Sequence, residues 1–321
     1  MKLAEQNIRL HGRIPFDANG NAALWWSFAG CSFRFYGTGF SLSATFTDEQ
    51  PAHLAFIIDG ITYKRAINGE ETFVSTVKDG EHTVFVRRVS NRAASGALLL
   101  TDFSVDGTLL TPPAKKQMNI EFVGDSITCG YGILGLPGGV YVSAEEDATI
   151  NYAALLAAHF DAEARFISMS GRGIVHNCDG SCSNLIPHLF NRYGRGINTA
   201  PFLFDDGFIP DVVIVNAGTN DVGGKTTEQQ METAATLFLK DIRTRYPHAK
   251  IVWTYGMMNT KFIPALQKAV DTVRESDKNV WFMPTTPVQA HTGETGPQGH
   301  PGIVGHRRLA KELIAFLKEI L

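Results

Sequence analysis

The sequence predicts an α/β protein in two parts, a β-sandwich followed by a three-layer α/β/α domain with a mostly parallel sheet. In the first part, apolar and polar residues alternate without a long helical segment, which is typical of antiparallel strands. In the second part, apolar runs alternate with helical segments, which is typical of a parallel sheet covered by helices. The prolines of TPPAKKQ separate the two patterns. We therefore expect the sandwich over residues 1–112, a linker over 113–118 and the α/β domain over 119–321.

The sandwich is predicted from one long alternating run and three turn signals. The run CSFRFYGTGFSLSATF, from Cys31 to Phe46, alternates apolar with polar residues and is interrupted by Gly37 and Gly39. Asp-Gly dipeptides suit two-residue turns, because both central residues of such a turn need a positive φ. We expect hairpins at Asp59-Gly60, Asp79-Gly80 and Asp106-Gly107.

The parallel sheet is predicted from five apolar runs, which read NIEFVG, ARFISMSG, DVVIVNAG, KIVWTYGM and NVWFMP. Between the third and the fourth run, Thr227 to Tyr246 has the spacing of an amphipathic helix. Its apolar face consists of Met231, Ala235, Phe238 and Ile242. The chemistry of such sheets takes place at the carboxyl ends of the strands, so candidate functional residues are expected there.

Composition and charge exclude several classes of protein. The chain has 321 residues, of which 44% are hydrophobic and 19% charged, so it can bury a large core. Its formal net charge is -3 without a basic stripe, which argues against nucleic acid as a partner. No apolar segment is long enough to span a bilayer, and we expect no membrane partner. The first residues lack the apolar core of a signal peptide, so we expect a cytoplasmic protein, with a homo-oligomer left open.

The cysteines do not indicate a metal site. Only Cys178 and Cys182 are close in sequence, and with His176 and Asp179 they form the stretch HNCDGSC. This spacing fits no common zinc pattern. We expect reduced, structural thiols and no metal.

Four residues of complementary chemistry lie at strand ends or before the last helix. Ser126 follows EFVGD, Gly171 follows FISMS, and Asn220 follows VVIVNAGT, while His300 precedes the last helix. A serine needs a base to become a nucleophile, and histidine is the residue whose pKa suits this task near neutrality. The oxyanion of the tetrahedral intermediate needs donors, which the backbone N–H groups of Ser126 and Gly171 and the side-chain amide of Asn220 would supply. The sequence therefore predicts acyl transfer.

A nucleotide site is the alternative interpretation of the glycines after Ser126. Gly130, Gly132 and Gly135 in GYGILG have the spacing G-x-G-x-x-G, which requires a helix immediately afterwards. The following LPGGVYV contains Pro137, Gly138 and Gly139, which disfavour a helix there. The serine hydrolase is therefore the better prediction.

The motifs around these residues resemble a known family. GDSIT, the glycine of SGRG, GTND and the histidine of GHP are similar to the four sequence blocks of the SGNH hydrolases, or GDSL esterases. With EEDATINYAALLA and PDVVIVNAGTND in this order, nearly the whole chain resembles carbohydrate esterase family 2. The resemblance implies an N-terminal jelly-roll domain, removal of O-linked acetyl groups from plant-wall polysaccharides and their oligosaccharides, and no metal or organic cofactor. It assigns the roles given above to Ser126, Gly171, Asn220 and His300.

One departure from the family concerns the group that orients His300. The positions where these families place an aspartate before the histidine hold Pro297 and Gln298. The Gln298 amide oxygen, a backbone carbonyl or Glu294 would have to accept from the Nδ1–H of His300. We expect a serine-histidine dyad with a neutral acceptor.

The remaining site predictions concern neighbours of these residues. Asp125 and Asp221 directly follow Gly124 and Asn220, and such carboxylates commonly tie loops by accepting backbone N–H bonds. Asp125 is also a candidate for substrate binding, together with Arg172.

Three functional hypotheses follow. The leading one is a serine esterase that deacetylates xylan, mannan or glucomannan oligosaccharides through an acetyl-serine intermediate. The second is an esterase or thioesterase on lipid-like or aryl acyl groups, but the segment GILGLPGGVYVSAEEDA is short for an apolar lid. The third is a non-catalytic carbohydrate-binding protein, which the presence of Ser126 and His300 argues against. No serine lies in a G-x-S-x-G elbow, which argues against an α/β-hydrolase.

Overall fold

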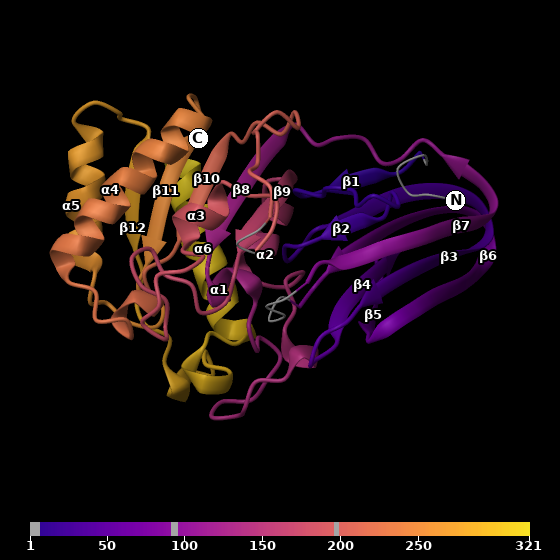
Figure 1. Cartoon of the computed structure of the whole chain (residues 1–321), viewed down its shortest axis with the longest axis horizontal. Coiled ribbons are helices and arrows are strands. Elements are labelled where there is room, and N and C mark those ends of the chain that lie inside the picture. The colour runs from indigo at the N-terminus through magenta and orange to yellow at the C-terminus, as the bar shows by residue number, and fades with distance from the viewer. Residues whose placement is uncertain (1–6, 91–95, 196–198) are drawn as a thin grey trace.

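The computed structural model describes residues 7–90, 96–195 and 199–321. It has two domains side by side, an N-terminal domain of strands and a C-terminal domain in which helices surround a sheet (Figure 1). The last strand of the first domain ends at Leu110, and the next strand begins at Met118, the last residue of the expected linker. Residues 1–6 of the expected sandwich lie outside the described residues. The predicted fold class is confirmed.

The N-terminal domain is an antiparallel sheet that curls around a core of aromatic side chains, among them Phe33, Phe40 and Phe103. The strand order is β2-β7-β3-β6-β4-β5, and β1 pairs with β3. The strands are β1 (Arg9–His11), β2 (Ala22–Leu24), β3 (Gly30–Phe46), β4 (Ala52–Ile58), β5 (Ile61–Ile67), β6 (Gly69–Arg88) and β7 (Leu98–Leu110).

Only one of the three predicted hairpins is present. Asp59 and Gly60 join β4 to β5 with φ of 49° and 85°, as a two-residue turn requires. The predictions at Asp79-Gly80 and Asp106-Gly107 are wrong, because these dipeptides lie inside β6 and β7. Gly80 and Gly107 both pair with Gly37, next to a bulge in β3. A Cβ on Gly107 would lie 2.1 Å from the carbonyl oxygen of Tyr36, so glycine allows the backbones to meet where the sheet bends.

The C-terminal domain has a five-stranded parallel sheet of order β12-β11-β10-β8-β9. Its strands are β8 (Met118–Gly124), β9 (Ala162–Ser168), β10 (Val212–Asn216), β11 (Lys250–Tyr255) and β12 (Val280–Pro284). The helices are α1 (Ser126–Cys129), α2 (Tyr152–His159), α3 (Ile186–Phe190), α4 (Glu228–Arg245), α5 (Ile263–Arg274) and α6 (Ile303–Ile320), with 3₁₀ turns η2 (Ser143–Glu145), η3 (Asn220–Val222), η4 (Ala290–Thr292) and η5 (Pro297–Gly299). Within the described ranges, none of the helices has the length and apolarity that a bilayer span requires.

Helices cover both faces of this sheet. Val123 of β8 packs in one core with residues of α3, α4 and α5, whereas its neighbour Phe122 packs in a second core with residues of α2 and α6. Successive side chains of a strand point to opposite faces, so the two cores lie on opposite sides of the sheet. The result is the predicted three-layer arrangement, visible in Figure 1.

In helix α4, the sequence determines both the first turn and the face that is buried. Thr227 and Gln230 form a capping box, in which Thr227 Oγ1 accepts from the Gln230 N–H at 3.2 Å and Gln230 Oε1 accepts from the Thr227 N–H at 2.9 Å. A good N-cap stabilises a helix by about 1 kcal/mol. The predicted apolar face is buried, since Met231, Ala235, Phe238 and Ile242 are each at most 2% exposed.

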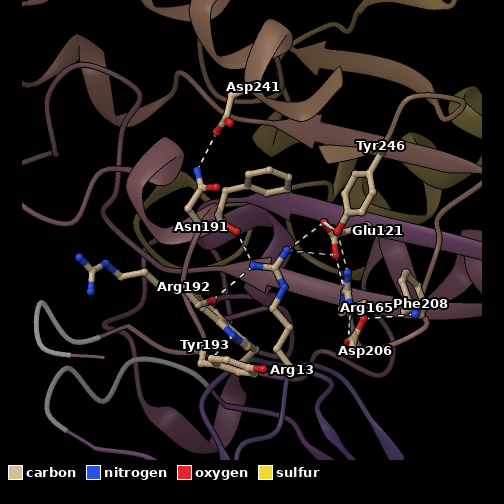
Figure 2. Close-up of polar contacts among 12 residues, drawn as sticks. Arg13, Glu121, Arg165, Asn191, Arg192, Tyr193, Asp206, Phe208, Asp241 and Tyr246 are labelled. Atoms are coloured by element: carbon tan, nitrogen blue, oxygen red, sulfur yellow. Dashed lines mark hydrogen bonds and ion pairs between the residues drawn. The ribbon is translucent and has the colours of Figure 1, made fainter. Parts of the chain in front are cut away.

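Arg13 links the N-terminal domain to the interior of the C-terminal domain (Figure 2). Its guanidinium lies 3.2 Å from Glu121 on β8 and 3.9 Å from the ring centre of Phe202. Glu121 also contacts Arg165 and accepts a hydrogen bond from the Tyr246 hydroxyl at 3.0 Å. Loss of one partner of a buried ion pair costs about 3–5 kcal/mol, because the other charge remains uncompensated. The contact therefore fixes one domain against the other.

Candidate active site

The ends of three neighbouring strands bring the predicted residues together. Gly124 of β8 is level with Ser168 of β9 and with Asn216 of β10. The loops that follow these positions therefore leave the sheet at the same edge, and they carry Ser126, Gly171 and Asn220.

A sharp turn from strand to helix presents Ser126. Ser126 is the first residue of α1, and the side chain of Asp125 caps the helix by accepting from the Ile127 N–H at 3.0 Å. A Cβ on Gly124 would lie 2.2 Å from Thr128 Oγ1, so only glycine fits before the turn. Gly130 ends the helix in the left-handed region with φ of 79°. The turn from β8 into α1 therefore presents the Ser126 side chain at the carboxyl edge of the sheet.

His300 lies in hydrogen-bond contact with Ser126. Its Nε2 is 2.9 Å from Ser126 Oγ. Burial lowers the pKa of His300 to about 4, against a smaller opposing effect of the backbone carbonyls of Pro297 and Gln298. The imidazole is therefore neutral at pH 7 and able to accept a proton.

The structure corrects the predicted role of the Gln298 side chain. Its Oε1 accepts from the Tyr131 hydroxyl at 2.6 Å, so this oxygen does not orient His300. Glu294 is also engaged elsewhere, at 2.6 Å from Arg308 Nε. His300 Nδ1 is buried beside the carbonyls of Pro297 and Gln298, without a hydrogen bond of regular geometry to any described residue. Of the three acceptors considered, the backbone carbonyl is the one that the geometry favours.

Two backbone donors lie at the strand ends. Within the described part of the chain, neither the N–H of Ser126 nor that of Gly171 donates a hydrogen bond. Asn220 is differently placed, since its Nδ2 donates to the carbonyl of Arg172 at 2.8 Å and more weakly to Asp125 Oδ2 at 3.4 Å. The second contact is long, so this amide hydrogen is the one that a substrate oxyanion can take over.

The two aspartates support loops. Asp221 accepts from the backbone N–H groups of Ile174, Val175 and His176 at 2.7–2.9 Å, as expected for a carboxylate that ties a loop. Asp125 is fully buried, and its contact with substrate stays a prediction. Burial also raises the pKa of Asp125 to about 7.

Arg172 is half-buried, and its Nη1 lies 3.5 Å from the carbonyl oxygen of Ser183. Its contact with substrate stays a prediction.

The glycines after Ser126 make room for the loop that carries His300. A Cβ on Gly132 would lie 3.0 Å from Pro297 Cδ, and a Cβ on Gly135 would lie 2.4 Å from Pro297 Cγ. Gly296 belongs to the same contact, since its Cβ would meet the Gly132 carbonyl oxygen at 2.9 Å. Packing of the histidine loop therefore explains the last two glycines of the G-x-G-x-x-G spacing, whereas Gly130 caps α1.

The cysteines follow the prediction only in part. All four are free, and Cys31 and Cys129 are buried. Cys178 and Cys182 are exposed, so the expectation that they are structural is wrong. Across residues 7–90, 96–195 and 199–321, no three His, Cys, Asp or Glu side chains are grouped so as to hold a metal ion.

Sequence reasoning missed Tyr131. Its ring centre lies 4.3 Å from that of His300, at an interplanar angle of 32°. The available signal was an aromatic residue between two glycines, one turn after the candidate nucleophile.

Comparisons with known proteins agree with this geometry. Residues 122–316 match the GDSL-like lipase/acylhydrolase family, and residues 10–113 match the carbohydrate esterase 2 N-terminal family. Cellulase/esterase CelE of Acetivibrio thermocellus is 29% identical over 98% of this chain, which spans only 39% of that relative's length. An acetylxylan esterase / glucomannan deacetylase of Cellvibrio japonicus is 26% identical over 75% of this chain and 68% of its own length.

Solved structures are similar over the whole chain. A family two carbohydrate esterase from Clostridium thermocellum, in complex with cellohexaose, has a TM-score of 0.89 and 28% identity, and the match covers 97% of this chain and 98% of that chain. The chain therefore belongs to the GDSL-like lipase/acylhydrolase family, and with its carbohydrate esterase 2 N-terminal domain it is a carbohydrate esterase.

Proposed function

We propose that this carbohydrate esterase removes O-acetyl groups from xylan, mannan or glucomannan oligosaccharides through a covalent acetyl-serine intermediate. The observation that carries the proposal is the 2.9 Å contact between Ser126 Oγ and His300 Nε2. It places a hydroxyl and a neutral base together, next to two backbone N–H groups that make no other hydrogen bond among the described residues.

Acylation begins when His300 Nε2 takes the Ser126 proton and Oγ attacks the acetyl carbonyl carbon. The oxyanion of the tetrahedral intermediate accepts from the N–H groups of Ser126 and Gly171, and from Asn220 Nδ2. Loss of one such donor costs about 3 kcal/mol of barrier. The C–O bond to the sugar then breaks, and the sugar oxygen leaves with the proton from His300. Acetyl-Ser126 remains.

Deacylation repeats the sequence with water. His300 takes a proton from the water, the hydroxide oxygen attacks the acetyl carbon, and the Ser126 oxygen leaves with that proton. Acetate and the free enzyme result. Because an alkoxide is a better leaving group than an amide nitrogen, an imidazolium without a carboxylate partner can still support turnover.

The substrate class is supported by the relatives. One relative is named as an acetylxylan esterase / glucomannan deacetylase, and the similar solved structure holds cellohexaose. Both names concern β-linked plant-wall polysaccharides or their fragments.

A linkage-resolved NMR assay on acetylated xylo- and manno-oligosaccharides tests the proposal. We expect acetate to appear as sugar acetyl signals disappear, and we expect no acetate with Ser126→Ala. Arg34→Met serves as a surface control, because this partly exposed side chain lies on β3 of the N-terminal domain. Equal rates for wild type and Ser126→Ala would contradict the mechanism, and no acetate from any oligosaccharide would contradict the substrate class.

A second candidate is an esterase on apolar acyl groups, because four apolar side chains are exposed on the segment beside Pro297. Their exposed fractions are 45% for Leu134, 78% for Leu136, 80% for Val140 and 47% for Val142. Nitrophenyl esters of increasing chain length separate the two candidates. The proposal requires activity to fall from acetate to octanoate, and the second candidate requires the reverse order.

A further inference from the structure

Tyr131 lies directly behind the two reacting residues. It follows the Gly130 cap of α1, and its N–H donates to the Ser126 carbonyl at 3.1 Å. Its side chain is 8% exposed. The ring covers one face of the His300 imidazole, at a centroid distance of 4.3 Å. One residue thus joins the backbone of the nucleophile to the side chain of the base.

The Tyr131 hydroxyl contacts the loop that carries the base. It donates to Gln298 Oε1 at 2.6 Å, and Gln298 is two residues before His300. Gln298 has φ of 52°, in the left-handed region that non-glycine residues rarely adopt. The hydrogen bond therefore holds a residue whose backbone would otherwise favour another conformation.

The ring of Tyr131 is itself held in place by a second tyrosine, Tyr141. The two rings stack at a centroid distance of 4.1 Å and an angle of 22°. The Tyr141 hydroxyl donates to Glu146 Oε2 at 2.6 Å. Lys64, from β5 of the N-terminal domain, donates to the carbonyl oxygens of Ala144 and Glu146 at 2.9 and 2.6 Å. The stack of three rings is thus supported by both domains.

We propose that Tyr131 is the positioning residue of the Ser126–His300 pair: its ring fixes the plane of the imidazole, and its hydroxyl fixes the loop through Gln298. This inference rests on the proposed serine esterase function. It assigns to an aromatic ring the orienting task that a triad aspartate performs elsewhere.

The ring has a second consequence, because it keeps water from the imidazole. Among the described residues, Ser126 and Tyr131 contact the His300 ring, and His306 on α6 is close enough to interact with it electrostatically. Burial lowers the pKa of His306 to about 3, so it stays neutral. Desolvation is the largest cause that lowers the pKa of His300, so opening the site should raise this pKa.

The test compares Tyr131→Leu with Tyr131→Phe, and Phe262→Leu is the control. Phe262 is a fully buried aromatic residue near α5, outside the active site. For Tyr131→Leu we expect kcat to fall about 100-fold with KM little changed, since a loosely oriented base affects the reaction more than binding. We expect the acid limb of the kcat/KM profile to move up by about one pH unit. Tyr131→Phe should restore the acid limb and most of kcat, remaining about fivefold below wild type because the hydrogen bond to Gln298 is lost.

The outcomes separate this inference from the proposed function. NMR titration of the His300 imidazole reports its pKa without any turnover. A raised pKa in Tyr131→Leu, but not in Phe262→Leu, supports the inference even if no acetate ester is cleaved. A Tyr131→Phe variant with wild-type kcat would overturn the role of the hydroxyl. The inference as a whole would be overturned if Tyr131→Leu folds, has the same kcat as Tyr131→Phe and leaves the imidazole pKa unchanged.

Discussion

The two loops that supply Ser126 and His300 are held in different ways. The nucleophile loop leaves β8, an interior strand of the sheet, and enters α1 at once, so local backbone geometry places Ser126. The histidine loop spans residues 285–302, between the edge strand β12 and α6, and contains only two short 3₁₀ turns. It reaches the site through packing of Pro297 on Gly132 and Gly135, and through the Tyr131 hydroxyl.

This difference indicates that the position of the nucleophile is a property of its own segment, whereas that of the base is a property of the tertiary structure. A change beside Ser126 should therefore act on the reaction directly. A change beneath the histidine loop should lower the rate while Ser126 and the fold stay in place.

The largest effect is expected for Ser126→Ala. Loss of the attacking oxygen should lower kcat by at least about 10⁴-fold, because members of one catalytic unit are strongly non-additive. His300→Ala should be about as severe. The melting temperature of both variants should stay within a few degrees of wild type. Acetate release assays and thermal melts check this, and substantial activity in either variant would remove that residue from the mechanism.

Gly135→Ala should disturb the base without touching the nucleophile. The new Cβ would lie 2.4 Å from both Pro297 Cγ and Glu145 Oε2, so the histidine loop must shift. We expect kcat to fall about 10- to 100-fold, because misplacement by about 1 Å is costly. Gly96→Ala is the matched control, since no atom of the described residues lies within 4 Å of its Cβ. Equal kcat for the two variants would show that the contact with Pro297 does not position His300.

Gln298→Ala should have a smaller effect. It removes the acceptor of the Tyr131 hydroxyl but leaves the ring on His300, so we expect a loss of a few-fold, against about 10⁴ for a triad aspartate. Glu294→Ala should leave kcat/KM unchanged, because that carboxylate pairs with Arg308. A thousandfold loss in either variant would identify that side chain as the orienting group.

Only a small change is expected between pH 7 and pH 5. His300 must be neutral to act as a base, and it becomes protonated only as the pH falls through its pKa of about 4. We expect kcat/KM to fall less than about twofold down to pH 5, whereas an ordinary histidine would give a loss of about 25-fold. A pH-rate profile on one acetylated oligosaccharide distinguishes these results. An acid limb near pH 6.5 would show that water reaches the imidazole.

The sequence allowed prediction of what depends on local pattern. The parallel strands, helix α4 and the residues at the strand ends follow from periodicity and from the edge at which parallel strands end. The hairpins predicted at Asp79-Gly80 and Asp106-Gly107 were wrong because glycine suits both a turn and a bulge. Only the pairing of the strands distinguishes the two structures.

The support of His300 could not be predicted in the same way. The contact between Tyr131 and Gln298 joins residues 167 positions apart, and no periodicity relates them. Asp125 likewise contacts Asn220, which lies 95 positions away on the loop after β10. Gly132 and Gly135 were visible in the sequence, but the sequence does not show that glycine is needed there because Pro297 packs against both positions.

Labelling with a fluorophosphonate tests the central claim most directly, because the reagent requires both an activated serine and a base in position. We expect one adduct per chain, on the peptide that contains Ser126, in parallel with loss of acetate release. In Gly135→Ala the labelling rate should fall by the same factor as kcat. His300→Ala should not be labelled. An adduct on another residue, or full labelling of His300→Ala, would contradict the account.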